Sequence, residues 1–408
     1  AKKKKLPTDF VVKLSDATSE AFHAWIEARK QDDFSVYIKP LEKMVEIQRE
    51  KTEIYGYEEH PYNALMGDYE PGAKVSEIDT LFADVRAKLT PFIEKVFAAK
   101  KSDDSFMYKH FPKDKQWDFG MDMLSLLGYD IDAGRQDIAE HPFSTSFSPL
   151  DSRVTTRVDE NNFYDMTWSC AHEAGHALYE QGMPVAQYGL PCGDAVSLGI
   201  HESQSRLYEN NVARSMAFWQ HNYGKLQTAF PANLQAVSLE DFYKGVNIVK
   251  PSLVRTDADE LTYHFHIMIR YEIEKKLILG EIEVKDLPTI WNEAYKKYLK
   301  IDVPSDKVGV LQDVHWAHGG FGYFPTYSLG SFYAAQFFAK ASEKIDNLEA
   351  KIAKGDMQPL LIWLRENIYQ HGRFYTPQEL CTKATGESLN FDYFMAYAEK
   401  KYGAIYGL

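Results

Sequence analysis

The amino-acid sequence predicts a mainly α-helical fold that contains one small β-sheet. Apolar residues recur at intervals of three and four in several segments, whereas the alternation typical of a strand is confined to one short segment. In addition, 45% of the 408 residues are hydrophobic, which is enough for a large core. Because no repeat or linker interrupts the pattern, we expect residues 1–408 to form a single domain.

Three helical segments are well marked. The first should begin near Ser76, which could cap it, and Pro91 should bend or end it. Another should begin at Ser238, three residues before Asp241. The apolar positions are Ile78, Phe82, Val85 and Leu89 in the first segment and Leu360, Leu361, Trp363, Leu364 and Ile368 in a third, near the end of the chain.

Two other segments are not helical in pattern. Residues 153–158, Arg-Val-Thr-Thr-Arg-Val, have the β-branched composition of a strand, and a strand this short needs partners in a small sheet. The glycine-rich segment from Gly319 to Gly330 lacks the preceding strand and following helix of a phosphate loop. We interpret it as a mobile aromatic loop.

Composition limits the classes of function. The formal charge is 46 − 59 = −13, and this acidic surplus argues against a nucleic-acid partner. No apolar stretch approaches the roughly 18 residues that a membrane helix needs, so we expect no membrane association. The three cysteines, Cys170, Cys192 and Cys381, show no CxxC spacing, which fits a reducing compartment and predicts a cytoplasmic protein.

The strongest chemical signal is the segment His172-Glu173-Ala174-Gly175-His176. On an α-helix, side chains four residues apart lie on one face, about 6 Å apart along the axis. The two imidazoles could therefore bind one Zn²⁺ ion, while Glu173 could activate a water molecule there. The polar residues before this segment could cap such a helix and Gly182 could end it, and we expect the small sheet beside it. The alternative is a chance match in which both histidines are ordinary surface or core groups.

A third ligand must come from outside this motif, because the residues after His176 do not match the metzincin pattern. Glu180 shares the helix face but lies about 9 Å along the axis from the midpoint of the histidines, so we interpret it as an exposed carboxylate. Glu202, on an expected second helix, is the stronger candidate. It completes a set of two histidines and one glutamate that admits zinc and also cobalt. Glu209 could instead hold a ligand histidine, and His201 is interpreted as a packed or hydrogen-bonded histidine.

Five motifs, in this order, resemble those of the carboxypeptidase Taq family of metallocarboxypeptidases. They are His141-Pro142-Phe143, Asp151-Ser152-Arg153-Val154-Thr155, His172 to His176, His201-Glu202-Ser203-Gln204 and Gly309-x-x-Gln312-Asp313-Val314-His315-Trp316. Together they span most of the chain, and five ordered motifs are far more specific than the two-histidine motif alone.

The resemblance implies a helical fold similar to those of neurolysin and angiotensin-converting enzyme, with two lobes around a deep groove. It also implies a homodimer that releases single C-terminal residues from peptides with broad specificity. The family's ligand positions fall on His172, His176 and Glu202, and its catalytic acid/base falls on Glu173. Family members carry a helical segment ahead of what is residue 1 here, so we expect this chain to lack that segment.

Three further residues are candidates for the chemical step. Charge that develops on the substrate oxygen needs a hydrogen-bond donor besides the metal. Tyr323 and Tyr327, in the glycine-rich segment, are our candidates, because related enzymes similarly use tyrosines on such a segment. The alternative at either position is a structural tyrosine. For His315, the family motif implies a place in the site.

Substrate binding needs a cation, because an exopeptidase must recognise a free carboxylate. Arg255 is our first candidate and Arg153 our second, with a structural ion pair as the alternative for each. His141 could order a loop that contacts the substrate, or it could simply form a packed turn.

Two rival functions stay open at this point. An oligopeptidase or dipeptidyl carboxypeptidase would share the same metal motif, and only a cation positioned for the substrate C-terminus would separate them. A non-catalytic helical binding protein with a vestigial motif would have no need of Glu173, and the presence of Glu173 counts against that reading.

Overall fold

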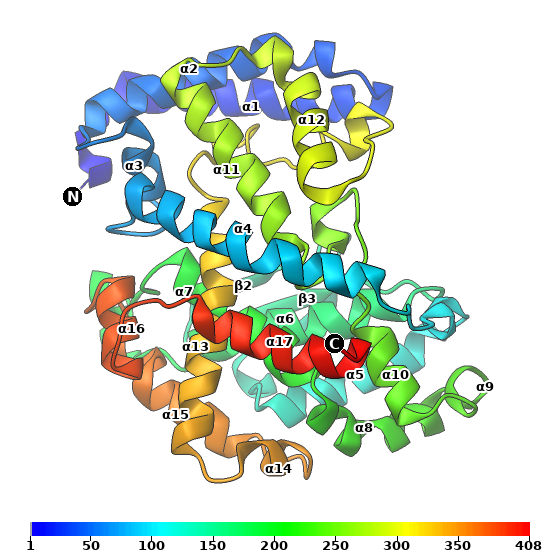
Figure 1. Ribbon diagram of the computed structural model, residues 1–408. Coiled ribbons are helices and arrows are strands. Elements are labelled where there is room, and N and C mark those ends of the chain that lie inside the picture. Colours follow the sequence, from blue (N-terminus) through cyan, green and yellow to red (C-terminus); the bar gives the residue numbers. More distant parts are fainter. Residues whose placement is uncertain (1) are drawn as a thin grey trace. The chain divides into compact units, whose positions relative to one another are not determined.

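The computed structural model describes residues 2–408, and helices dominate it (Figure 1). Among the described residues there is one sheet, which has three strands. The prediction of a mainly helical fold with one small sheet is therefore confirmed. The chain divides into two compact units. Unit 1 comprises the residues up to Ile93 together with Val249–Ser328, and unit 2 comprises Glu94–Ile248 and Leu329–Leu408. The single domain and the groove expected from the sequence stay predictions.

Unit 1 is helical throughout. Its α-helices are α1 (Thr8–Gln31), α2 (Ile38–Tyr55), α3 (Pro61–Met66), most of α4 (Val75–Ala98), α11 (Tyr263–Leu279), α12 (Leu287–Leu299) and the first residues of α13 (Pro325–Lys344). Helix α2 packs on α1, and α11 packs on α2, α3 and α12. Every residue of α11 from Tyr263 to Tyr271 is buried, as are four of the remaining eight, so this helix is the centre of the unit.

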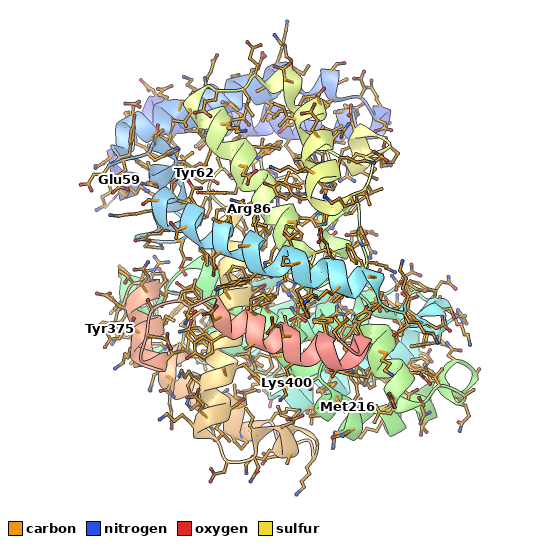
Figure 2. The ribbon with its side chains drawn as sticks, in the orientation of Figure 1. Glu59, Tyr62, Arg86, Met216, Tyr375 and Lys400 are labelled. Carbon is orange, nitrogen blue, oxygen red and sulfur yellow. The ribbon has the colours of Figure 1, made fainter. Side chains whose placement is uncertain are left out.

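Helix α4 shows where the sequence was informative and where it was not. Its predicted apolar stripe is buried as expected, and Phe82 packs edge-on against Tyr271 of α11 with 5.2 Å between ring centroids. Ser76 was expected to cap the helix, but α4 begins one residue earlier and the Ser76 hydroxyl donates to Glu59 instead. Pro91 lies inside the helix and does not end it. Arg86, labelled in Figure 2, forms an ion pair with Glu272 of α11 at 2.8 Å.

A buried carboxylate holds the glycine-rich segment in place. Glu274 of α11 accepts hydrogen bonds from the Tyr62 hydroxyl (2.5 Å; Tyr62 is labelled in Figure 2), the Trp316 indole (2.8 Å) and the Gly322 amide (2.9 Å). Gly322 has a φ of +90°, and a Cβ there would meet the backbone nitrogen of Met66 at 2.6 Å. The mobile loop expected from the sequence is therefore a packed one, because its backbone lies directly on α3.

Unit 2 contains the sheet and the remaining helices. Its strands are β1 (Gln136–Ile138), β2 (Ser144–Ser148) and β3 (Asp151–Thr156). Its helices, besides the rest of α13, are α5 (Lys113–Leu127), α6 (Phe163–Gln181), α7 (Leu198–Arg206), the π-helix η7 (Leu207–Ala213), α8 (Met216–Ala229), α9 (Pro231–Leu234), α10 (Leu239–Val246), α14 (Leu348–Ile352), α15 (Gln358–Asn367), α16 (Pro377–Thr385) and α17 (Asp392–Tyr406).

Helix α6 is the centre of unit 2. Strands β2 and β3 and helices α5, α7 and η7 all pack against it. The predicted strand is β3, which lies between β1 (parallel) and β2 (antiparallel) and buries every second residue. The expected position of the sheet beside the helix that carries the two-histidine motif is thus confirmed.

Local sequence sets the helix ends as expected at three sites in unit 2. Asn162 caps α6 by accepting from the Tyr164 amide, and Gly182 follows its last residue. Ser238 caps α10 by accepting from the Asp241 amide, and α15 covers the third predicted segment except for Ile368, which follows its last residue. Among the described residues, no helix combines the length and the apolar character needed to cross a membrane.

Candidate metal centre

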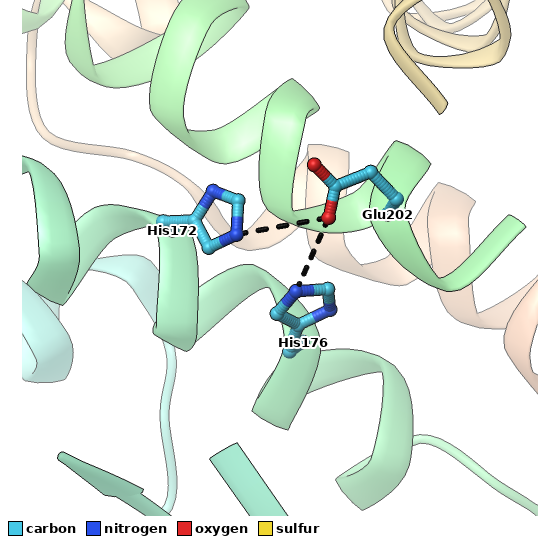
Figure 3. A group of neighbouring side chains, drawn as sticks. All are labelled: His172, His176 and Glu202. Atoms are coloured by element: carbon cyan, nitrogen blue, oxygen red, sulfur yellow. Dashed lines mark ion pairs between the residues drawn. The ribbon is translucent and has the colours of Figure 1, made fainter. Parts of the chain in front are cut away.

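Helix α6 presents both histidines of the motif on one face. His172 and His176 lie one turn apart, with 4.9 Å between their ring centroids. Both rings turn their Nε2 atoms toward the same oxygen, Oε2 of Glu202, at distances of 3.7 Å and 3.5 Å (Figure 3). The three candidate ligand atoms all lie within 4.8 Å of one another. The structure therefore brings together the three ligands that the sequence predicts.

Close helix packing places Glu202 at this point. Helix α7 begins at Ser197, whose hydroxyl accepts from the Ile200 amide at 3.0 Å. It crosses α6 so closely that a Cβ on Gly175 would meet the carbonyl oxygen of Gln204 at 2.4 Å. On the other side, a Cβ on Gly330 of α13 would meet Cγ of Glu202 at 2.5 Å. Two glycines thus allow the approach that fixes the carboxylate.

The geometry of these three residues fits a tetrahedral divalent metal ion. Ligand bonds of about 2.0–2.2 Å would separate neighbouring ligand atoms by about 3.3–3.6 Å. The two measured His–Glu separations, 3.5 Å and 3.7 Å, are close to that edge length. Nitrogen and oxygen ligands in this ratio suit zinc.

The second ring nitrogen of His172 is held by a carboxylate. Its Nδ1 lies 2.9 Å from Oε2 of Glu209, which belongs to the π-helix η7 and is also paired with Arg206 (3.2 Å) and Arg214 (3.4 Å). Although burial opposes ionisation, these charges hold the pKa of Glu209 at about 2. Glu209 thus contacts a candidate ligand histidine, as the sequence suggested it could. Burial lowers the pKa of His172, but the nearby carboxylates outweigh it and raise the value overall.

The second ring nitrogen of His176 has a different partner. Its Nδ1 lies 2.6 Å from Nδ1 of His201, and Nε2 of His201 lies 2.8 Å from Oε1 of Glu180. His201 is thus hydrogen-bonded, as the sequence suggested. The interpretation of Glu180 as an exposed carboxylate was wrong, because its side chain is only 24% exposed and contacts His201. The sequence analysis placed Glu180 on the same helix face as the histidines but missed that His201 connects it to His176.

Glu173, the sequence-based candidate for the acid/base, follows His172 on α6. It is buried, and burial raises its pKa to about 7. The charge on His172 acts in the opposite direction, Glu202 raises the pKa further, and a hydrogen bond with Ser144 of β2 lowers it. A carboxyl group whose pKa lies near neutrality can both accept and return a proton. The strand β2 therefore helps to set the properties of this residue.

The two tyrosines predicted on the glycine-rich segment lie within unit 1 together with His315. Nε2 of His315 lies 3.1 Å from the Tyr327 hydroxyl, and the rings of Tyr323 and Tyr327 have centroids 5.1 Å apart. Burial lowers the pKa of His315 to about 4, with Asp313 acting against this shift. These three side chains form one cluster of possible hydrogen-bond donors.

The two arginine candidates have different environments. Arg255 is buried in unit 1 and donates from Nε and a terminal nitrogen to Oδ1 of Asp313, at 3.1 Å and 2.9 Å. Arg270, which sequence reasoning missed, donates to the other oxygen at 2.6 Å. Arg153 lies on β3 in unit 2, pairs with Asp151 through two hydrogen bonds and is 45% exposed at its side chain. His141 is exposed in the connection between β1 and β2.

Comparison with known proteins assigns this arrangement to a family. Residues 1–402 match the family model described as carboxypeptidase Taq (M32) metallopeptidase. The chain is 43% identical to carboxypeptidase 1 of Bacillus subtilis over 404 residues, covering 99% of this chain and 81% of that protein. It is 43% identical to thermostable carboxypeptidase 1 of Thermus thermophilus over 415 residues, with 98% and 81% covered.

A solved structure gives the same assignment. The M32 carboxypeptidase from Deinococcus radiodurans R1 superposes with a TM-score of 0.97 at 41% identity, covering 99% of this chain and 82% of that chain. The family is one of metal-dependent peptidases, so the chain is a hydrolase that acts on peptides. Because these matches extend over nearly its whole length, the chain belongs to the carboxypeptidase Taq (M32) family of metallopeptidases.

Proposed function

We propose that this metallocarboxypeptidase uses zinc to remove single C-terminal residues from peptides with broad specificity, with Glu173 as the general base. The observation that carries the proposal is the convergence of His172, His176 and Glu202 on one point, with the buried Glu173 next to His172 on the same helix. Cobalt suits the same ligands and is the alternative ion.

The metal and Glu173 divide the chemistry between them. A zinc ion held by the three ligands would polarise the scissile carbonyl and lower the pKa of a water molecule. Glu173 takes the proton from the attacking water and later delivers it to the leaving amine. Its buried position beside His172 supports this role, because a carboxyl group near neutrality is suited to both transfers.

Other residues of the chain would bind the substrate. We assign stabilisation of the charge on the carbonyl oxygen to Tyr323 and Tyr327, with His315 oriented by its contact with the Tyr327 hydroxyl. Arg255 and Arg153 are the candidates for the substrate carboxylate. Each arginine is paired with an aspartate, but the exposed Arg153 is more accessible to a substrate than the buried Arg255, and this favours Arg153. His141, also exposed, would order a loop at the substrate.

We also propose a cytoplasmic homodimer with peptides as partners and no nucleic-acid or membrane role. All three cysteines are free thiols in the structure, which supports a reducing compartment. The formal charge of −13 supports the absence of a nucleic-acid partner.

The test is a pair of N-blocked peptides that differ only in having a free or an amidated C-terminus, analysed by mass spectrometry. We expect stepwise loss of single residues from the free acid alone, abolished by a chelator and restored by Zn²⁺ or Co²⁺. The Glu173→Gln variant should be about 10²–10⁴-fold slower while still binding metal. Equal cleavage of both peptides at internal bonds would instead show an endopeptidase.

A further inference from the structure

The two candidate histidine ligands are held by unlike partners. His172 contacts a carboxylate directly, and two arginines fix that carboxylate from behind. His176 contacts another imidazole, His201, which in turn contacts the carboxylate of Glu180. A ligand histidine usually donates its free N–H to a carboxylate or carbonyl. His176 is therefore connected to the carboxylate of Glu180 only through the ring of His201.

The hydrogen bonds determine which ring nitrogens of His176 and His201 carry protons. If Nε2 of His176 binds the metal, its Nδ1 carries the proton and donates to Nδ1 of His201 at 2.6 Å. Nδ1 of His201 must then be the acceptor, so its proton is on Nε2, which donates to Glu180 at 2.8 Å. Each member thereby sets the tautomer of the next, and the ring of His176 is held with Nε2 toward Glu202.

The surrounding residues contact and largely cover His201 and Glu180. Glu180 follows His176 by one turn of α6 and also forms a hydrogen bond with Ser146 of β2. The buried ring of Tyr179 packs edge-on against His201, with 5.2 Å between centroids. The side chains of His176, His201 and Glu180 are 16%, 17% and 24% exposed. Strand β2 and helices α6 and α7 therefore enclose a continuous chain of hydrogen bonds from His176 through His201 to Glu180.

From this geometry we propose that His201 and Glu180 are positioning residues, which hold His176 in the tautomer and orientation that bind the metal. The proposal rests on the metal site assigned under the proposed function. Outer partners of this kind contribute about 10–100-fold to metal affinity. His201 itself does not bind the metal, since both of its ring nitrogens are engaged.

The test measures zinc affinity by competition with a chromophoric chelator, together with the thermal stability of the metal-free protein. His201→Phe keeps a ring but removes both hydrogen bonds, and it should weaken zinc binding about 10–100-fold. His201→Asn keeps an acceptor atom at the position of Nδ1, so it should recover most of the affinity. His371→Phe, at a half-buried histidine with a ring contact to Tyr375, is the matched control and should bind zinc like the wild type.

Glu180 gives a second, milder pair of variants that decides the question if His201→Phe fails to fold. Glu180→Gln keeps an acceptor for His201 and should bind zinc within about two-fold of the wild type, whereas Glu180→Leu should bind several-fold more weakly. Wild-type zinc binding with no change in His201→Phe and Glu180→Leu would overturn the proposal. Absence of zinc binding by the wild type would instead overturn the metal site itself.

The absorption spectrum of the cobalt-loaded protein separates positioning from general stability. A positioning role predicts altered d–d bands in His201→Phe and bands close to those of the wild type in His201→Asn. A purely structural role predicts a lower melting temperature of the metal-free variants with unchanged affinity and spectrum, and this result would contradict the proposal.

Discussion

Two buried clusters of charge in this protein differ in how their charges are compensated. In unit 1, Asp313 lies between Arg255 and Arg270, and each of its oxygens accepts from one arginine. In unit 2, His172 and His176 direct nitrogen atoms at an oxygen of Glu202 across gaps of 3.7 Å and 3.5 Å, too long for hydrogen bonds. The first cluster is complete within the protein, and the second converges on a point where a cation fits.

This difference separates a carboxylate that is fully paired within the protein from a group of side chains that leaves room for a cation. Although burial opposes its ionisation, the charges of Arg255 and Arg270 hold the pKa of Asp313 well below its usual range. That carboxylate therefore needs no external partner. Burial lowers the pKa of His176 to about 4, which favours the neutral ring that a metal ligand needs, whereas nearby carboxylates raise the pKa of His172.

The largest effect on stability is expected when the cluster of Asp313, Arg255 and Arg270 is disrupted. Asp313→Asn removes the charge shared by two buried arginines and should lower the free energy of unfolding by about 3–5 kcal/mol in urea denaturation. The same variant should bind zinc with unchanged affinity. Asp151→Asn, which breaks an exposed pair with Arg153, is the matched control and should cost less than about 1 kcal/mol. A loss below about 1 kcal/mol for Asp313→Asn would contradict the view that Asp313 stabilises the fold by pairing with both arginines.

Glu274 offers a third case, a buried carboxyl group whose hydrogen-bond donors are all neutral. Burial raises its pKa from 4.5 to about 7, even though the donors from Tyr62, Gly322 and Trp316 favour the ionised form. Between these values the folded state holds a proton that the unfolded state has lost, so stability should fall as pH rises from about 4.5 to about 7. The total change from this group is about 3 kcal/mol.

Urea denaturation across that pH range checks this prediction. Glu274→Gln removes the titration and should flatten the curve, whereas Glu272→Gln, on the same helix but partly exposed, should leave its slope unchanged. If Glu274→Gln shows the wild-type slope, the buried carboxyl group is not the source of the pH dependence.

Disrupting the cluster of His172, His176 and Glu202 should change zinc affinity and metal-free stability to different extents. Glu202→Gln should weaken zinc binding at least about 100-fold, equivalent to about 2.7 kcal/mol. Metal-free stability should fall less than in Asp313→Asn, because Arg206 keeps its second partner, Glu209. Isothermal titration with zinc and urea denaturation of the metal-free protein measure the two quantities. Equal stability losses in both variants would remove the distinction between the clusters.

The smallest expected effect concerns the cap that positions Glu202. Ser197→Ala should cost about 1 kcal/mol of stability and weaken zinc binding a few-fold, because α7 carries the ligand. Ser238→Ala removes the equivalent cap of α10, which carries no ligand, and should cost a similar amount of stability without a change in zinc affinity. Equal zinc affinities in the two variants would show that the cap does not position Glu202.

The sequence predicted the metal cluster better than the arginine cluster for a physical reason. His172, Glu173 and His176 share one helix, so spacing alone fixes their geometry, and Glu202 needed only one further helix. Arg255, Arg270 and Asp313 are far apart in sequence and meet only after tertiary packing. Arg270 was therefore missed.

Errors in the local predictions have similar causes. Glu180 was judged only as a direct ligand, and its helical distance from the metal gave no hint that His201 would connect it to His176. The glycine-rich segment was expected to be a mobile loop because it lacks the setting of a phosphate loop. Glu274, which holds the Gly322 amide, lies on another helix and could not be anticipated from that segment.

The most direct test of the central claim is X-ray absorption spectroscopy at the zinc edge of the loaded wild-type protein. The account predicts two imidazole nitrogens and carboxylate or water oxygens at about 2.0–2.2 Å, with no sulfur ligand. A sulfur neighbour at about 2.3 Å, or fewer than two imidazoles, would place the metal elsewhere and contradict the assignment of His172, His176 and Glu202 as its ligands.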